Sequence, residues 1–127
     1  MAHFEKHFTL EEANALLPEL RRLLAHLQTL RGKLVVDWEQ AKPVVEAAPM
    51  NGGGKEAAPF LADIYALNNQ VRKIVEMGVQ LKDLERGLVD FPAWKEDREV
   101  FLCWHLGEDR IEFWHELETG FSGRKAL

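Results

Sequence analysis

The sequence is poor in several features that would point to particular classes of protein. It has a single cysteine, Cys103, so no disulfide can form within the chain, and we expect a reducing, cytoplasmic environment. No apolar run approaches the roughly 20 residues that a membrane-spanning helix needs. Lys and Arg total 16 against 21 Asp and Glu, and no dense basic segment offsets the net charge of -5. We therefore expect protein partners, and neither nucleic acid nor a membrane.

Motifs of common enzyme and metal-binding families are also missing. Gly52, Gly53 and Gly54 follow no predicted strand, and no GxxxxGK sequence is present to hold a phosphate. No serine lies in a nucleophile elbow, and zinc-finger, EF-hand and HExxH patterns are absent. These absences predict no cofactor.

The first part of the chain has the pattern of a long helix. With 127 residues, 46% of them hydrophobic, residues 1–127 can form a single domain around one core. Thr9 and Glu12 have the spacing of a capping box, and leucines from Leu16 to Leu34 recur at alternating steps of 4 and 3. The pattern predicts a coiled-coil-like helix over 9–42 with a kink at Pro18, which lacks a backbone donor.

A second helix is predicted over 60–77, where apolar residues again recur at steps of 4 and 3. Gly78 suits the left-handed position that commonly follows a helix. Residues 43–59 are rich in Ala, Pro and Gly, so we expect a flexible linker there. Two such helices joined by a linker are expected to pack as a long antiparallel hairpin.

After Gly78 the apolar period changes to 2, which is typical of strands. Four short strands are expected to form an antiparallel meander within 79–115: Val79–Asp83, Leu88–Phe91, Val100–His105 and Ile111–His115. Residues 116–127 are expected to be a loop or frayed tail. The predicted fold class is α+β, with the helical hairpin packed on a small sheet.

The predicted strand register decides which side chains share a face of the sheet. If residues 107–110 close the last hairpin, Cys103 lies opposite Trp114 and Leu102 lies opposite His115. His105 and His115 then project from opposite faces, which excludes a metal site that uses both.

In the same predicted register, Trp104 and Trp114 also project from opposite faces of the sheet. Apolar area therefore remains on the face turned away from the helices. Three alternatives follow for this spare face. It can be a partner surface, the wall of a pocket, or a face covered by the loop 92–98 and the tail with Phe121.

Several side chains are candidates for chemistry, each with a simpler structural interpretation. Asp90 can be a base or ligand, or it can form a surface pair with Lys82, which lies opposite it if Leu81 pairs with Phe91. His115 has acidic neighbours, but it can equally pack at the sheet edge with backbone hydrogen bonds. Cys103 is expected to be an inert buried thiol.

His3 and His7 have the spacing of a metal clip but precede the first helix. We therefore expect both rings to be solvated.

Several sequence strings together resemble a known family. They are FTLEEAN at 8–14, GLVDFPA at 87–93, LCW at 102–104, FWH at 113–115 and GFSGR at 120–124. The chain resembles a family of small bacterial and archaeal proteins catalogued only as a domain of unknown function. The resemblance implies no activity. It implies that the recognisable pattern lies in the sheet half and tail, with a candidate functional cluster of Asp90, Trp104, Glu108, His115 and Arg124.

Two functions are consistent with these observations. The first is a non-enzymatic cytoplasmic module that binds protein or forms a homo-oligomer through its helices or the spare sheet face. The alternative is a small metal-dependent or acid-base enzyme on the sheet half. Its site would use Asp90, Glu108 and His115, with a divalent metal on these three residues and Arg124 completing the pocket.

Overall fold

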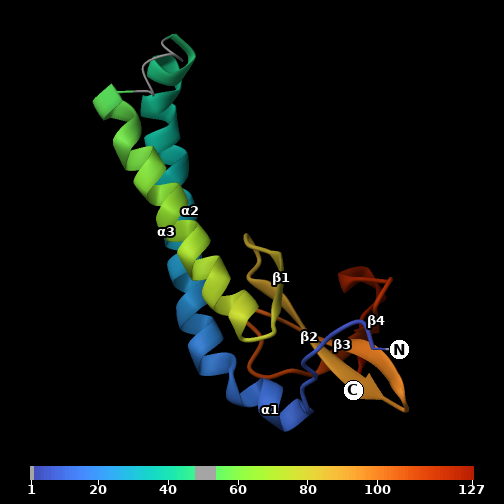
Figure 1. Cartoon of the computed structure of the whole chain (residues 1–127). Coiled ribbons are helices and arrows are strands. Elements are labelled where there is room, and N and C mark those ends of the chain that lie inside the picture. The colour runs from blue at the N-terminus through green and yellow to red at the C-terminus, as the bar shows by residue number, and fades with distance from the viewer. Residues whose placement is uncertain (1, 48–53) are drawn as a thin grey trace.

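The computed structural model describes residues 2–47 and 54–127, and it has an α+β fold (Figure 1). Two long helices form an arm that rises away from a small sheet. The helices are α1 (Leu10–Ala15), α2 (Leu17–Ala47) and α3 (Gly54–Glu76). The strands are β1 (Gln80–Asp83), β2 (Leu88–Lys95), β3 (Arg98–His105), β4 (Phe113–Glu116) and β5 (Lys125–Ala126). Within the described ranges, no helix is both long enough and apolar enough to cross a membrane.

The first helix begins at the predicted capping box. The Thr9 hydroxyl accepts a hydrogen bond from the Glu12 amide at 3.0 Å, and the Glu12 carboxylate accepts one from the Thr9 amide at 2.9 Å. The chain then breaks at Leu16, between α1 and α2. Pro18 lies in the first turn of α2, where its missing amide proton removes no helical hydrogen bond. The predicted single helix with a kink at Pro18 is therefore wrong, because two helices meet at Leu16 instead.

Both long helices extend beyond their predicted ends. The α2 helix continues through Pro43 to Ala47, and α3 begins at Gly54 and includes Pro59. Residues 43–47 and 54–59 of the predicted flexible linker are thus helical, and its remaining residues, 48–53, lie outside the described residues. One missing donor near a helix end leaves most of the surrounding hydrogen bonds intact, so neither proline stops its helix.

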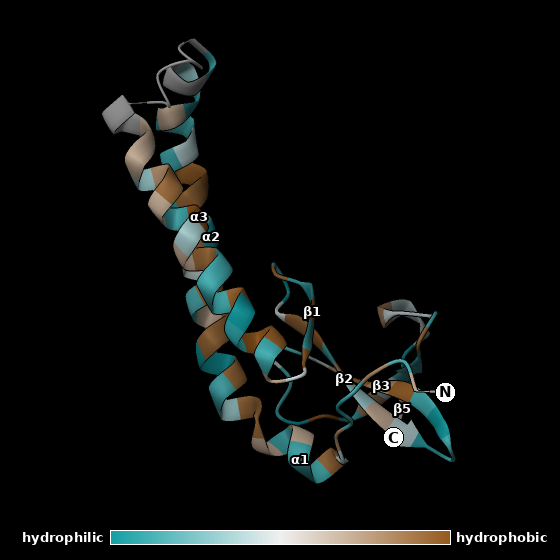
Figure 2. Cartoon of the chain, in the orientation of Figure 1, coloured by the Kyte–Doolittle hydropathy of each residue, from teal (hydrophilic) through white to brown (hydrophobic). Residues whose placement is uncertain are grey.

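The α2 and α3 helices lie side by side and run in opposite directions (Figure 1). The Lys33 ammonium binds Asp63 at 2.9 Å, and the rings of Trp38 and Phe60 are 4.8 Å apart. Residue numbers rise along one helix as they fall along the other. Hydrophobic residues recur along both helices, including the half of the arm that is distant from the sheet (Figure 2).

The sheet is antiparallel, with five strands in the order β1-β2-β3-β4-β5, one more than predicted. The segment 92–98, expected to be a loop, instead continues β2 and starts β3, and Glu96 and Asp97 form the turn between them. The tail is also more regular than expected. It contains the 3-10 turn η2 (Phe121–Gly123), and β5 pairs with β4.

The register between β3 and β4 differs from the predicted one by one residue. Leu102 lies opposite Trp114, and Phe101 lies opposite His115. The connection between these strands is longer than the predicted turn, since β3 ends at His105 and β4 begins at Phe113. Within it, the Ile111 amide donates to the Asn14 side chain at 2.8 Å. A helix residue that is distant in sequence therefore holds the loop that sets this register.

The shift in register reverses the prediction of which side chains share a face of the sheet. A one-residue slip moves every side chain of a strand to the other face. Trp104 and Trp114 therefore share one face of the sheet, and His105 and His115 share the other. The β1-β2 prediction was wrong as well, since Asp90 lies opposite Gln80 and not opposite Lys82.

The core lies between the helices and one face of the sheet. Phe91 and Trp104 are fully buried there against Leu20, Leu24 and Leu27 of α2. This packing joins the base of the arm to the sheet.

The other face of the sheet is covered by the two ends of the chain. The Phe4 ring lies 5.3 Å from Phe101, and the Arg124 guanidinium lies 4.1 Å from the ring centroid of Phe113. Cover by the tail was one of the three alternatives for this face. The part played by the N-terminal segment was not predicted.

Candidate functional site

Two titratable side chains meet inside the sheet, on the face turned away from the helices. Asp90 of β2 and His115 of β4 are 3% and 1% exposed. The His115 Nε2 atom lies 3.0 Å from each Asp90 carboxylate oxygen, and Nδ1 lies 2.6 Å from the Glu116 carbonyl oxygen. A carbonyl oxygen only accepts, so Nδ1 is the donor in that bond. The Nε2 atom therefore faces both oxygens of the Asp90 carboxylate.

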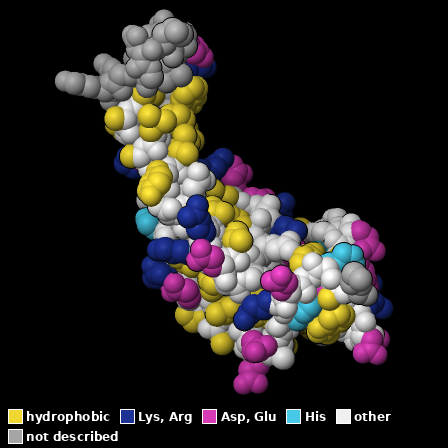
Figure 3. Space-filling view, viewed as in Figure 1, with side chains coloured by type: hydrophobic (Ala, Val, Ile, Leu, Met, Phe, Trp, Pro, Cys, Tyr) yellow, Lys and Arg dark blue, Asp and Glu magenta, His cyan; other side chains and the backbone are white. Residues whose placement is uncertain are grey.

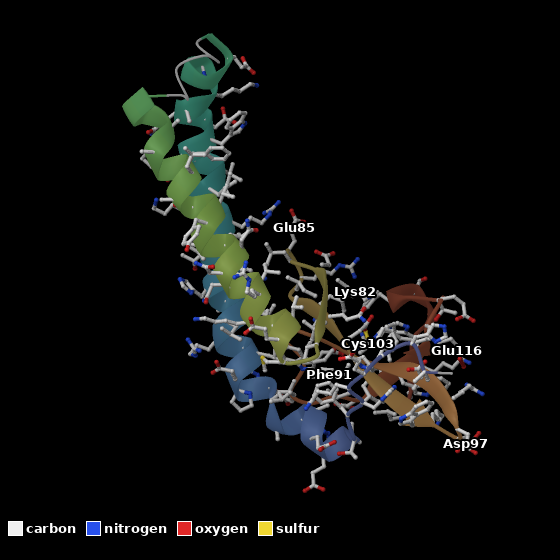
Figure 4. All side chains as sticks on the ribbon, viewed as in Figure 1. Lys82, Glu85, Phe91, Asp97, Cys103 and Glu116 are labelled. Atoms are coloured by element: carbon white, nitrogen blue, oxygen red, sulfur yellow. The ribbon has the colours of Figure 1, made fainter. Side chains whose placement is uncertain are left out.

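Cys103 of β3, labelled in Figure 4, is a further member of this region. It lies directly opposite Asp90 and is fully buried. Burial raises the pKa of its thiol to about 12, and the negative charge of Asp90 and a hydrogen bond to that carboxylate act in the same direction. The positive charge of Arg124 offsets only part of this rise. The thiol is therefore protonated at neutral pH and is not a nucleophile, which agrees with the predicted buried thiol.

A second pair, Glu108 and Arg124, closes the edge of this region. The Arg124 Nη2 atom donates to the two Glu108 carboxylate oxygens at 2.8 and 2.9 Å. It also lies 3.4 Å from the Cys103 carbonyl oxygen, and the guanidinium is 4.7 Å from the Phe121 ring centroid. Glu108 in turn accepts a hydrogen bond from the His105 amide at 3.0 Å. The pair ties the tail to the loop that follows β3.

The structure brings together four of the five candidate residues in two pairs, Asp90 with His115 and Glu108 with Arg124. Trp104 lies on the opposite face, in the core with the helices, and only its indole Nε1 reaches this region, donating to the Glu108 carbonyl oxygen at 2.9 Å.

The side chains that could share a metal ion are not quite those expected. The three predicted ligands were Asp90, Glu108 and His115. Among the described residues, the atoms that lie within 4.8 Å of one another belong to Asp90, Cys103 and His115. Sequence reasoning missed Cys103 in this role, because only the observed register places it opposite Asp90 and on the face of His115.

A separate polar cluster joins the N-terminal segment to β3. The Glu99 carboxylate, whose side chain is 5% exposed, accepts hydrogen bonds from the amides of His3 and Phe4 and contacts both histidine rings at 2.7 Å. Burial alone would raise the pKa of Glu99, but these hydrogen bonds outweigh it and lower the pKa to about 2. The His7 side chain is only 14% exposed and stacks on Trp94 at 4.4 Å, so the expectation that it is solvated was wrong.

Comparison with known proteins gives one match. A family model described as "Uncharacterized conserved protein (DUF2203)" matches residues 6–127, which includes every described strand and both residue pairs above. No curated protein and no solved structure shows a significant match.

Proposed function

This chain belongs to the DUF2203 family, and we propose that it is a cytoplasmic interaction module that pairs with a second copy of itself through the helical arm. The observation that carries this proposal is a set of large apolar side chains on the arm that contact water. Val35 and Val36 on α2 are 48% and 59% exposed, and Leu61 and Tyr65 on α3 are 55% and 72% exposed. We call these four residues the arm patch.

The arm patch extends across both helices. Because Lys33 binds Asp63 in an antiparallel pair, Val35 lies level with Leu61, and Tyr65 is one turn further along α3. Apolar side chains gather over this part of the arm in Figure 3. The high exposure of all four side chains shows that the arm patch points outward, where a partner can cover it.

A second arm is a suitable partner in size. A helix of the length of α3 is about 35 Å long, and two adjacent helices are about 20 Å across, so one side of the arm presents about 700 Å². Stable interfaces bury roughly 800 Å² on each partner. Two arms packed together would form a four-helix bundle, which buries the arm patch of both copies.

The charges of the arm also permit self-association. The Lys33 ammonium binds Asp37 at 2.8 Å and Asp63 at 2.9 Å, so one positive charge offsets one of the two carboxylates and a single negative charge remains. Repulsion between one such charge on each of two arms is small and is screened by salt.

The test is the oligomeric state of the full-length protein at low micromolar concentration. Light scattering is expected to give twice the chain mass of 14.6 kDa for the wild type and the chain mass alone for Tyr65→Lys. The lysine is well tolerated on a free surface but loses hydration in an apolar interface. The matched control is Leu10→Lys, since Leu10 is 42% exposed but lies on α1, outside the arm. This control is expected to remain a dimer.

Two results would contradict the proposal. If the wild-type protein is monomeric at these concentrations, it does not pair through the arm. If the Tyr65→Lys variant is still a dimer, the two copies pair through a surface other than the arm patch.

The alternative, an enzyme on the sheet half, has no comparable support. Asp90 and His115 are almost completely buried beneath the ends of the chain, and the Cys103 thiol is protonated. A substrate has no direct approach to this pair in the structure described here.

A further inference from the structure

We propose that Asp90, Cys103 and His115 form a binding site for a zinc-like divalent cation, independent of the arm. The three side chains come from the adjacent strands β2, β3 and β4 and project from the same face of the sheet. One oxygen, one sulfur and one nitrogen atom lie within 4.8 Å of one another. Strands place these atoms more rigidly than loops would.

The set of donor atoms is one that zinc prefers. Zinc binds cysteine sulfur at about 2.3 Å and histidine nitrogen or carboxylate oxygen at about 2.0–2.2 Å, in tetrahedral geometry. Ligand atoms around such an ion are separated by roughly 3.3–3.8 Å, so the three side chains need only small rotations to reach it. Three protein ligands leave a fourth position for water.

The histidine is already held in the orientation that a metal ligand requires. Its Nδ1 atom donates to the Glu116 carbonyl oxygen, which directs Nε2 towards Asp90 and the Cys103 side chain. Histidine ligands in metal sites commonly donate their second ring nitrogen to a backbone carbonyl in this way. The strand backbone thus provides the second hydrogen bond of a metal-binding histidine.

The ligand set matches the charge of a divalent cation. A carboxylate and a thiolate together carry two negative charges, and a neutral imidazole adds none, so the bound ion would be neutralised by its own ligands. The nearby Arg124 is already paired with Glu108.

The three ligands are buried, and an open groove lies beside them on the surface. Gln80 and Phe101 line it, and these residues pair across the strands with Asp90 and His115 respectively. Phe4 of the N-terminal segment forms another part of its wall. A hydrated ion reaches the ligands only if this segment moves aside.

Cobalt(II) is a suitable probe because it reports the identity of its ligands. Full-length protein without an affinity tag is first treated with a chelator and then titrated with Co²⁺. We expect one ion per chain, with visible bands of tetrahedral cobalt and a thiolate-to-cobalt charge-transfer band in the near ultraviolet. Zn²⁺ is expected to abolish both signals and to raise the melting temperature.

Substitutions identify the ligands. Cys103→Ser is expected to eliminate the charge-transfer band, and Asp90→Asn and His115→Gln are expected to weaken Co²⁺ binding at least tenfold. The matched control is His105→Gln, since His105 lies on β3 two residues from Cys103 and on the same face. This control is expected to bind Co²⁺ as the wild type does. Circular dichroism establishes that each variant is folded.

A second control addresses the N-terminal cluster. The double variant His3→Gln/His7→Gln removes both histidines around Glu99 and is expected to leave the charge-transfer band unchanged. If this variant loses Co²⁺ while folded Cys103→Ser retains it, the cation binds at Glu99 and the proposal is wrong. Folded wild-type protein that gives no charge-transfer band also overturns it.

Discussion

Buried charged side chains in this protein are held by partners that are distant in the sequence. Glu99 is the clearest case, because its carboxylate on β3 binds the backbone and both histidine rings of the N-terminal segment. The sequence marks His3 and His7 by their spacing but gives no sign of Glu99, which is 92 residues from His7. Contacts of this kind depend on the path of the whole chain.

The lowered pKa of Glu99 predicts a loss of stability in acid. Its pKa is about 2 in the folded protein and near 4.5 when unfolded, so the unfolded state takes up the proton first as pH falls. This contribution is fully present above pH 4.5 and is lost between pH 4.5 and about 2. Urea denaturation is expected to show that Glu99→Gln is less stable than the wild type at pH 6, and that the difference decreases at pH 3.

Glu116 provides the control for this measurement. It is also a β-strand glutamate and binds Arg98 at 2.5 Å, but its side chain is 24% exposed. Glu116→Gln, measured at the same two pH values, is therefore the matched loss of one strand carboxylate. If the stability difference from the wild type changes equally with pH in both variants, Glu99 contributes no more than Glu116 to the loss of stability in acid.

At the scale of elements, local signals predicted where structure begins better than where it ends. The Thr9 capping box and the strand at Leu88 were correctly located, because each depends on neighbouring residues. The prolines were misleading, since α2 continues past Pro43 and α3 includes Pro59. Ala41 and Ala57, each two residues before one of these prolines, are fully buried, so packing supports the turns that contain the prolines.

The turn between β2 and β3 offers a test at this scale. Glu96 and Asp97 have φ angles of 51° and 67°, in the left-handed region that costs an ordinary residue about 1–2 kcal/mol. Two-residue hairpin turns of this kind favour glycine at the second position. Asp97→Gly relieves this strain in the folded state, and the larger entropy of the unfolded chain with glycine offsets part of that gain. The substitution is therefore expected to raise the free energy of unfolding by up to about 1 kcal/mol. Urea denaturation measures the change, and a loss of stability would contradict this account of the turn.

At the scale of the whole molecule, one core joins the base of the arm to the sheet. Leu20 of α2 is fully buried among Phe91 and Trp104, whereas the arm patch further along the same helix pair contacts water. Within residues 2–47 and 54–127, the molecule therefore has a buried base and an arm with apolar side chains exposed on its outer surface. This division separates the part that maintains the fold from the part that we propose binds another copy.

Truncation of Leu20 should demonstrate the importance of this core. Leu20→Ala is expected to lower the free energy of unfolding by about 2–5 kcal/mol, because it removes buried methyl groups and leaves a cavity. The control Val75→Ala, at a residue of α3 that is 59% exposed, is expected to change it by less than about 0.5 kcal/mol. Both values come from urea denaturation at one protein concentration. Similar effects for the two variants would show that Leu20 is not part of the core.

The amino-acid pattern was enough to predict an α+β protein and the change from helices to strands after Gly78. These features depend on the spacing of apolar residues along short stretches of the chain, which the sequence itself contains. The grouping of Asp90, Cys103 and His115 depends instead on a register that Asn14 helps to set by holding the Ile111 amide. A slip of one residue exchanges the two faces of a strand, so the site became visible only when distant parts of the chain were in contact.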